Sequence, residues 1–252
     1  MLENPEDQIA MNTIKAELEE KGYYIAENVI PQEYISEVLK EISSIKQNKS
    51  VKSKNSTIFG IRGILSQSPE TRELAFNVKI FSLVKSLIGE SAHLVKGIYF
   101  DKTAQTNWKV PHHQDLTIAV KNRVDIKGFG PWSIKAGVHH VQAPIHIMKN
   151  LLAVRCHLDE MGVENGTLRV IPGSHHLGKI TNAQLNRIRE SHGEITCCAP
   201  KGSIMLMRPL LLHASSKGTR PMNRRVIHFE YAPEGLLPKE LVWQEKYSGP
   251  PV

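Results

Sequence analysis

The sequence predicts a mainly β protein with helices (an α+β fold), in which short strands form a sandwich or jelly roll and helices pack outside it. Apolar residues recur at helical intervals up to about residue 89. Beyond that point the chain consists of short β-rich runs separated by Gly, Pro and Asn turns. The chain has no regular βαβ alternation and no glycine fingerprint of a nucleotide-binding fold, which argues against a doubly wound sheet.

Residues 1–90 are predicted to be mostly helical. Residues 9–21 carry Ile9, Ile14 and Leu18 at helical spacing, and Gly22 marks the end of the helix. The run YYIAENVI is typical of a strand, and PQEYISEVLKEISSIK then begins a second helix with its proline. After a predicted loop at 47–56, the run Ser68-Pro69-Glu70 opens a stretch of two short helices that ends near Gly89.

Residues 91–235 are predicted to form the jelly-roll core of a single domain that spans residues 1–252. The β-rich runs are HLVKGIYF, HHQDLTIAV, NLLAVRCHLD, TLRVI, EITCCA, GSIMLMR, LLLHAS and RRVIHFEYA. Between the second and third runs lies a long, glycine-bearing, irregular stretch at residues 121–140. Long loops of this kind often cover a binding site, so we expect a lid here.

The net charge of +7 allows two classes of partner, nucleic acid and an anionic small molecule. The basic residues are scattered, however, and their one local concentration, Lys46 to Lys54, is typical of a solvated loop. We therefore expect a small-molecule substrate, which the charge allows to be anionic, and no nucleic acid. No apolar run is long enough to span a membrane, the N-terminus is acidic and polar, and the three cysteines form no CxxC motif. These features indicate a cytoplasmic protein without a membrane partner or a disulfide framework.

Two His-x-Asp motifs are candidate metal sites. One is His113-Gln114-Asp115 in VPHHQDLTIAV, and the other is His157-Leu158-Asp159 in NLLAVRCHLDE. Side chains two apart on a strand point to the same side, and a distant histidine would complete a facial set of two histidines and one carboxylate, which suits Fe(II). Spacing alone does not choose between the two motifs. The polar face that contains His157 is equally typical of a cavity wall and of a solvent-exposed strand.

Three ordered blocks, NWKVPHHQDLTI, ENGTLRVIPGSH and LLLHASSKGTRPMNRRVIHFEYA, resemble the phytanoyl-CoA dioxygenase family of iron(II)- and 2-oxoglutarate-dependent oxygenases. The resemblance runs from GYYIAENVIPQEYI to the last strand and implies a double-stranded β-helix, the cupin-like form of the jelly roll. In that family the His-x-Asp motif precedes the NG…PGSH block. The resemblance therefore implies His113 and Asp115 as metal ligands, with His213 as the distal ligand.

The resemblance also implies a site for 2-oxoglutarate. Arg224, eleven residues after His213, matches the family arginine that receives the distal carboxylate of the co-substrate, and a guanidinium suits that role. Ser215 shares a strand face with His213, and the family often has a serine at this place. Trp132 resembles a family tryptophan near the co-substrate. By strand alternation, Arg225 should point away from the site.

The implied reaction uses Fe(II), 2-oxoglutarate and O2, with ascorbate as a supporting reductant, releases succinate and hydroxylates a small molecule. Because related halogenases lack the carboxylate ligand, Asp115 favours hydroxylation over halogenation. Two alternatives stay open: a cupin-like metalloenzyme that does not use 2-oxoglutarate, and a non-catalytic binding module of the same fold. Substrate contacts are expected from residues 121–140, residues 46–54 and Arg62. The sequence assigns no role to His139, His140, Arg155 and His157, and no oligomeric state.

Overall fold

The computed structural model describes residues 5–54, 57–220 and 223–251. Its α-helices are α1 (Pro5–Lys21), α2 (Gln32–Ser44), α3 (Pro69–Ala75), α4 (Val78–Ile88), α5 (Ile145–Lys149) and α6 (Asn182–His192). Its strands are β1 (Tyr23–Ala26), β2 (Val51–Lys54), β3 (Thr57–Arg62), β4 (His93–Lys102), β5 (Val110–His113), β6 (Thr117–Val120), β7 (Trp132–Lys135), β8 (Val138–Gln142), β9 (Leu152–His157), β10 (Leu168–Val170), β11 (Ile195–Thr196), β12 (Ile204–Met207), β13 (His213–Ser215) and β14 (Arg224–Ala232). Short 3-10 turns lie at Ile64–Ser66, Val163–Asn165 and Ser174–Leu177.

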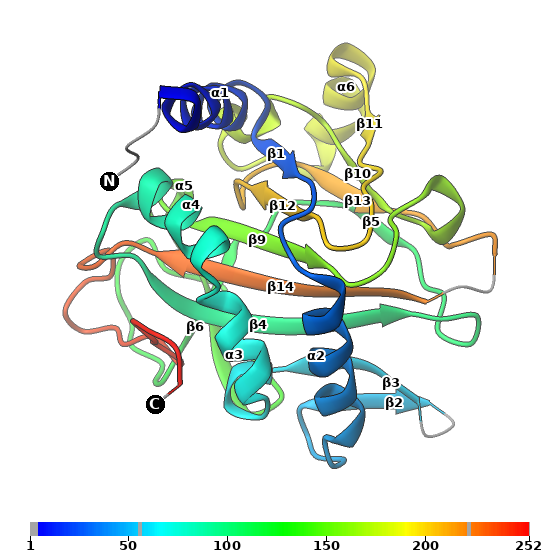
Figure 1. The fold of residues 1–252 in the computed structure, drawn as a ribbon. Helices are drawn as coiled ribbons and strands as arrows, with labels where there is room; N and C mark the ends of the chain where they lie inside the picture. The colour runs from blue at the N-terminus through cyan, green and yellow to red at the C-terminus, as the bar shows by residue number, and fades with distance from the viewer. Residues whose placement is uncertain (1–4, 55–56, 221–222, 252) are drawn as a thin grey trace.

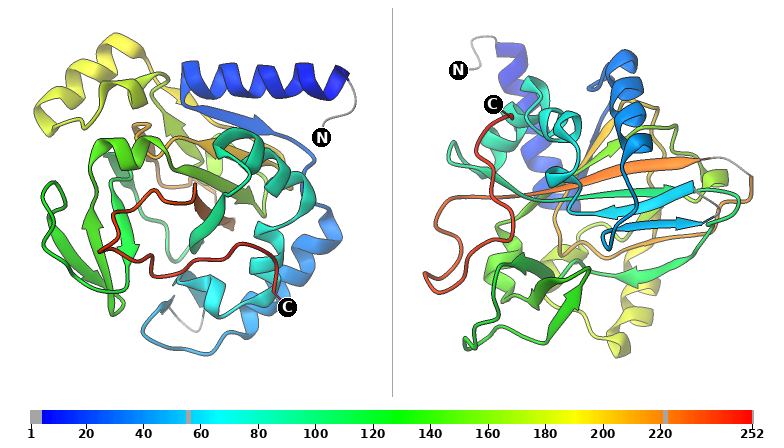
Figure 2. Two further views of the ribbon diagram at one scale, coloured as in Figure 1. Left: turned by 90° about the vertical axis from the view of Figure 1, so that its left-hand side faces the viewer. Right: turned by 90° about the horizontal axis from the view of Figure 1, so that it is seen from below.

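The described strands pair into antiparallel sheets (Figure 1). A seven-stranded sheet has the order β1-β12-β9-β14-β4-β3-β2, and a four-stranded sheet has the order β11-β10-β13-β5. These two sheets form the layers of a jelly roll, so the predicted fold class is confirmed. A third sheet, β6-β8-β7, lies beside the C-terminal segment, and the Val120–Trp243 bridge joins the two (Figure 2).

Strand alternation gives the large sheet two different faces. In β14, the side chains of Ile227, Phe229 and Tyr231 are buried in the core that the sheet shares with helices α1 to α4. The Tyr231 hydroxyl donates a 2.6 Å hydrogen bond to the carbonyl oxygen of Ala75 at the end of α3. The even-numbered residues of β14 face the opposite way, because side chains on a strand alternate. That second face carries the polar residues of the site.

The N-terminal part is less purely helical than the sequence predicts. Strand β1 pairs with β12, and the β2–β3 hairpin extends the large sheet beyond β4, so residue 91 is not a boundary of this sheet. The predicted loop at 47–56 is therefore wrong in part, since Val51–Lys54 forms a strand whose first side chain is buried. The single domain over residues 1–252 stays a prediction, and its residues 1–4, 55–56, 221–222 and 252 lie outside the described part of the chain.

The stretch at 121–140 is not one irregular loop. Residues Trp132–Lys135 form β7, which pairs with β8 from Val138 onward. The run WSIK does alternate apolar and polar residues, but it has only four residues and follows Gly128 and Gly130, so the sequence did not separate it from the surrounding loop. The role of this stretch as a lid stays a prediction. No helix in the described ranges is both long and apolar enough to cross a membrane.

Candidate metal centre

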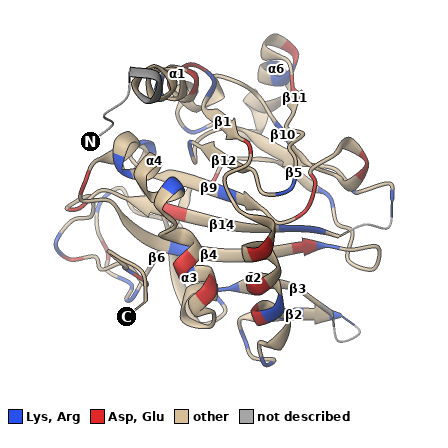
Figure 3. Cartoon of the chain, viewed as in Figure 1, with Lys and Arg blue, Asp and Glu red and all other residues tan. Residues whose placement is uncertain are grey.

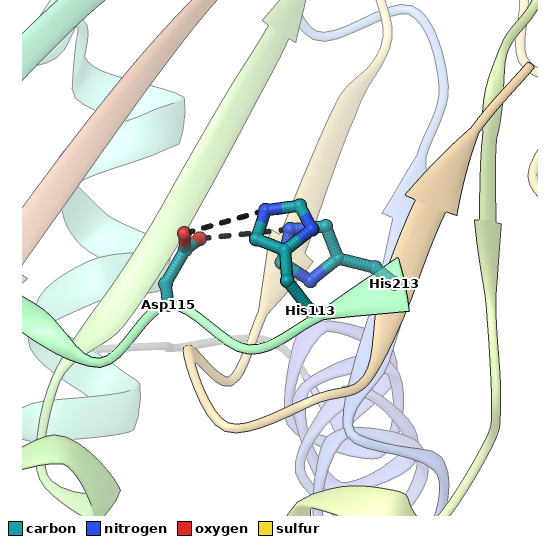
Figure 4. Close-up of side chains that lie close together, drawn as sticks. All are labelled: His113, Asp115 and His213. Carbon is teal, nitrogen blue, oxygen red and sulfur yellow. Dashed lines mark ion pairs between the residues drawn. The ribbon is translucent and has the colours of Figure 1, made fainter. Parts of the chain in front are cut away.

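Two distant parts of the chain bring three side chains to one point (Figure 4). His213 starts β13, His113 ends β5, and Asp115 lies in the connection between β5 and β6. Their ligand atoms all lie within 4.8 Å of one another. The Nε2 atoms of His113 and His213 are 3.9 Å and 3.7 Å from the two carboxylate oxygens of Asp115, too far for hydrogen bonds. The spacing suits a cation among the three groups.

Long-range backbone contacts, and not a shared strand, set this geometry. The expectation that His113 and Asp115 lie on the same strand is wrong, because β5 ends at His113. Beyond the strand, the amide of Asp115 donates a 2.9 Å hydrogen bond to the carbonyl oxygen of Pro209, in the segment that leads to β13. His113 itself is paired with His213 in the antiparallel register of β5 and β13. The two histidines are therefore cross-strand neighbours, and the carboxylate is fastened beside them.

Gln114 fixes the connection between the two ligands of the motif. Its side-chain amide donates hydrogen bonds of 2.7 Å to the carbonyl oxygens of Gly178 and Leu210. Its side-chain oxygen accepts a 2.8 Å bond from the amide of Ile180. The middle residue of the His-x-Asp motif is thus buried and fully engaged, and it orients Asp115 without contacting the metal position.

Both histidines have one ring nitrogen committed to the backbone. His213 Nδ1 lies 2.8 Å from the carbonyl oxygen of Leu211, and His113 Nδ1 lies 2.9 Å from that of Pro111. A carbonyl oxygen only accepts, so each Nδ1 must carry the proton. Each Nε2 is then left with its lone pair facing Asp115, which is the tautomer that a metal-binding histidine needs.

The electrostatic environment prepares these groups to bind a cation. Burial opposes ionisation of Asp115, but His213, His228 and Lys96 outweigh it and hold the pKa of the carboxyl group well below its usual range. Burial lowers the pKa of His213 to about 4, so its ring is neutral at pH 7. An ionised carboxylate beside a neutral imidazole is the protonation state required for metal binding.

The three side chains line a cavity of about 230 Å³ between the two large sheets. The four-stranded sheet contributes His213, Ser215 and Leu168, and β14 and β4 contribute its opposite wall. His113 keeps 41% of its side-chain surface exposed, compared with 4% for His213, so the centre opens on the His113 side. Small molecules can reach the metal position from that side.

One end of this cavity gathers cationic groups. Arg224 is buried and lines the cavity; its guanidinium donates one 2.8 Å hydrogen bond to the carbonyl oxygen of Gly166, and its Nε has no partner. Ser215 also lines the cavity and accepts a 2.9 Å hydrogen bond from Lys102 of β4. Burial first, and then Arg224 and Arg155, lower the pKa of Lys102 to about 7. These groups place positive charge and hydrogen-bond donors at one end of the cavity.

Gly166, which accepts the hydrogen bond from Arg224, lies where the backbone leaves no space for a side chain. Its φ of +68° is in the left-handed region, and an added Cβ would lie 2.4 Å from the carbonyl oxygen of Ser216. The sequence ENGTL therefore ends a 3-10 turn at this glycine, where the backbone approaches β13 closely and presents its carbonyl oxygen to Arg224.

The cavity also contains a buried polar chain that the sequence motifs did not indicate. Lys96 forms a 2.6 Å ion pair with Glu230, and His228 Nε2 lies 3.4 Å from the same carboxylate oxygen. On its other side, His228 Nδ1 lies 3.3 Å from the Nη1 of Arg155. Figure 3 shows Lys and Arg positions, in blue, on both β9 and β14. This chain connects β4, β14 and β9 along the cavity wall.

The second His-x-Asp motif has a different role. Asp159 receives two side-chain hydrogen bonds from Arg225, of 2.8 Å and 2.6 Å, on the far side of β14 from the cavity. Arg225 thus points away from the site, as strand alternation predicts. His157 is buried and does not line the metal cavity. Its neighbour Arg155 does line it, so this strand face is a cavity wall and not a solvent face.

Trp132 lies apart from the metal cavity. Its ring packs edge-on against His139, with ring centroids 6.5 Å apart, and Arg123 lies over it. It belongs to the apolar cluster around β6 and β8 and does not line the cavity around His213. The structure therefore gives no contact that supports its predicted place beside the co-substrate.

Comparison with known proteins agrees with this geometry. The family model of phytanoyl-CoA dioxygenase (PhyH) matches residues 18–226, most of the chain. The chain belongs to the phytanoyl-CoA dioxygenase family. Within this family of iron(II)- and 2-oxoglutarate-dependent oxygenases, His113, Asp115 and His213 are the facial triad. A phytanoyl-CoA dioxygenase domain-containing protein 1 homolog from Caenorhabditis elegans is 25% identical over 201 residues, which are 73% of this chain and 60% of that protein.

Solved structures show the same fold. EctD from S. alaskensis with bound Fe superposes with a TM-score of 0.67 at 18% identity, covering 87% of this chain and 75% of EctD. The epimerase SnoN from nogalamycin biosynthesis, described as α-ketoglutarate-dependent, gives a TM-score of 0.67 at 17% identity, covering 90% of this chain and 82% of SnoN. The predicted double-stranded β-helix is thereby confirmed.

Several functional residues were not found from motifs, although the sequence contains a signal for them. On β4, Lys96, Ile98, Phe100 and Lys102 alternate toward the site, and on β14 the residues Arg224, His228 and Glu230 do the same. Because every second side chain of a strand points to the same face, placing Arg224 in the cavity predicts that His228 and Glu230 share that face. The partner of Glu230 lies 134 residues away and has no local signal.

Proposed function

We propose that this protein is an iron(II)- and 2-oxoglutarate-dependent dioxygenase that hydroxylates a small-molecule substrate. The observation that carries the proposal is the presence, in a single cavity, of a two-histidine, one-carboxylate triad and an anion site built around Arg224. The triad suits Fe(II) because it occupies one face of the ion and leaves the opposite positions open. When bound there, the iron would supply the oxygen chemistry, coupled to decarboxylation of 2-oxoglutarate.

The protein groups have distinct tasks in this proposal. The backbone carbonyl oxygens of Leu211 and Pro111 hold each Nδ1 proton, which keeps the Nε2 lone pairs of the ligand histidines directed at the ion. Asp115, with its low pKa, supplies the negative charge. Its presence also supports hydroxylation over halogenation, since it occupies the position that a halide would need.

The anion site would bind the distal carboxylate of 2-oxoglutarate. Arg224 offers guanidinium N–H groups beyond the one committed to Gly166, and Ser215 offers its hydroxyl group. Lys102 adds a positive charge when protonated, and it reaches both Ser215 and, at 2.7 Å, the carbonyl oxygen of Ser216. A fork-shaped arginine with two further donors matches a carboxylate in shape and in charge. An EctD structure that contains 2-oxoglutarate and 5-hydroxyectoine shares the fold, with a TM-score of 0.65.

Succinate formation tests this function. Purified protein with Fe(II), 2-oxoglutarate, O2 and ascorbate should form succinate, and addition of a true substrate should increase the rate. The His213→Ala variant should lose this activity, because one of the ligands is gone. A metalloenzyme that does not use 2-oxoglutarate would instead turn over without it, and a binding module would form no succinate; either result would refute the proposal.

A cytoplasmic location belongs to the same proposal. The three cysteines are free thiols, and Cys156 and Cys197 are buried. Reduced cysteines are typical of a reducing compartment, as is a metal site for Fe(II). Fractionation of cells with an antibody against the protein would test the compartment directly.

A further inference from the structure

A second cavity adjoins the metal cavity. It encloses about 500 Å³ and shares two lining residues with the metal cavity, Lys96 and Ile98 of β4. Its walls are the β3 end at Arg62, the β6–β8–β7 sheet, and the C-terminal segment from Val242 to Tyr247. That segment is fastened at both ends, by the backbone bonds of Lys121 with Val242 and of Leu94 with Tyr247. The second cavity is therefore a built part of the fold.

Positive charge dominates its lining. The cationic residues that line it are Arg62, Lys96, Lys121, Lys135 and Lys246. Lys96 is paired with Glu230, and Lys246 is paired with Glu234 at 2.7 Å. Among the residues that the structure describes, no carboxylate lies within ion-pair distance of the remaining three. The half-buried Arg62 and Lys135 thus face the cavity without a counter-charge.

The remaining polar groups of the lining do not neutralise this charge. Among the described residues, Glu245 is the one carboxyl group that lines the second cavity. Burial raises the pKa of Glu245 to about 7, so about half of this group is protonated at neutral pH. His140 is 5% exposed, and its Nδ1 has no hydrogen-bond partner in the described structure. Burial, followed by Lys96 and Lys135, lowers the pKa of His140 to about 4. The ring is then neutral and has an uncommitted polar atom.

Unpaired cations in a half-buried cavity are costly unless an anion offsets them. Burial, and then Arg62 and Lys96, lower the pKa of Lys135, which shows that these cations repel one another. A bound oxyanion would reverse this repulsion, and the planar guanidinium of Arg62 can bind two oxygens at once.

We propose that the substrate carries an oxyanion group, a carboxylate or a phosphate, which Arg62 and Lys135 bind in the second cavity while the rest of the molecule extends past Ile98 toward the metal centre. This inference rests on the proposed function, because it takes the metal cavity to be the place of reaction. The Lys96–Glu230 pair lies at the junction of the two cavities. Because Glu230 neutralises Lys96 at this junction, the uncompensated positive charge lies deeper in the second cavity, on Arg62 and Lys135. The anionic end of the substrate is therefore attracted away from the triad.

The inference is tested by binding of acetate and inorganic phosphate to the protein loaded with Mn(II) and saturating 2-oxoglutarate, so that the co-substrate site is already filled. Dissociation constants come from the rise in Tm with probe concentration. At least one probe should bind, and Arg62→Gln and Lys135→Gln should each raise its Kd about tenfold, as expected for loss of one charge-assisted contact. Which probe binds identifies the group as carboxylate or phosphate.

The matched control is Lys127→Gln, which removes one positive charge from an exposed residue of the same stretch outside the lining of either cavity. Its Kd should equal that of the wild type. Absence of binding by both probes, unchanged Kd in both cavity variants, or an equal loss in Lys127→Gln would overturn the inference. Succinate formation by the wild-type protein is measured separately. If the wild-type protein forms succinate but binds neither probe, this inference alone is refuted, whereas absence of succinate refutes the proposed function.

Discussion

Replacing Arg224 with alanine should weaken 2-oxoglutarate binding about 30- to 150-fold. Arg224 is 4% exposed, and one of its N–H groups is already bonded to Gly166, so the others are available to the co-substrate. Truncating one partner of a buried, hydrogen-bonded charge pair costs about 2–5 kcal/mol. Ser215 and Lys102 remain beside the vacated space and would still bind the carboxylate. We therefore expect the lower part of that range, about 2–3 kcal/mol, which corresponds to the stated change in Kd.

The assay is calorimetric titration of 2-oxoglutarate into protein loaded with Mn(II), which binds the same ligands and does not start the reaction. Metal affinity, measured first by equilibrium dialysis, should be unchanged in the variant, because Arg224 does not contact His113, Asp115 or His213. This separates loss of the carboxylate anchor from loss of the metal.

The neighbouring arginine provides a matched control. Arg225→Ala removes the same side chain one position along β14, where it pairs with Asp159 on the other side of the strand. This variant should lose thermal stability and keep its affinity for 2-oxoglutarate. Wild-type affinity in Arg224→Ala, or an equal loss in Arg225→Ala, would refute the assignment of the anchor.

Three further predictions concern the centre and the second cavity. Asp115→Ala should reduce Mn(II) affinity about 100-fold or more, measured by equilibrium dialysis, because substitution of residues outside the coordination sphere already weakens metal binding about 10- to 100-fold. Wild-type affinity in this variant would exclude the carboxylate as a ligand. Gln114→Ala leaves the carbonyl oxygens of Gly178 and Leu210 and the amide of Ile180 without their hydrogen-bond partner. The free energy of unfolding should therefore fall by about 2–4 kcal/mol, and Mn(II) should bind less tightly. An unchanged midpoint of denaturant unfolding would contradict this. Glu245 has a folded pKa raised from 4.5 to about 7, so its proton is bound more tightly in the folded state, and its contribution to stability falls as pH rises from about 4.5 to 7. Glu245→Gln should therefore raise the free energy of unfolding at pH 8 by up to about 3 kcal/mol and have little effect at pH 4, and equal effects at both values would show that the carboxyl group is not perturbed.

Local sequence signals were sufficient for several elements. The Ser68-Pro69-Glu70 run does open α3, where the Ser68 hydroxyl accepts a 3.0 Å hydrogen bond from the amide of Thr71. Period two correctly separated Arg224 from Arg225, because both lie within one regular strand. The order of the family blocks selected the correct His-x-Asp motif, which spacing alone could not do.

Contacts between distant segments were not accessible in the same way. Asp115 is positioned by Pro209 and not by a strand of its own, and no pattern around residue 115 announces that partner. The pairing of β5 with β13, which makes the two histidines neighbours, likewise depends on how the chain returns after 100 residues. Strand β2 was missed because three of its four residues are polar and exposed at the sheet edge, where burial imposes little pattern, although its partner β3 (TIFGIR) is largely apolar.

The two halves of the site are mounted on different layers. The histidines belong to the four-stranded sheet, Arg224 belongs to the seven-stranded sheet, and the hydrogen bond from Lys102 to Ser215 crosses between them. In the proposed function, a co-substrate held by the metal at one end and by Arg224 at the other would connect the two layers. Its affinity would then depend on the distance between the two sheets. A substitution in the packing between α2 and the large sheet could therefore reduce turnover without altering any residue that contacts the reactants.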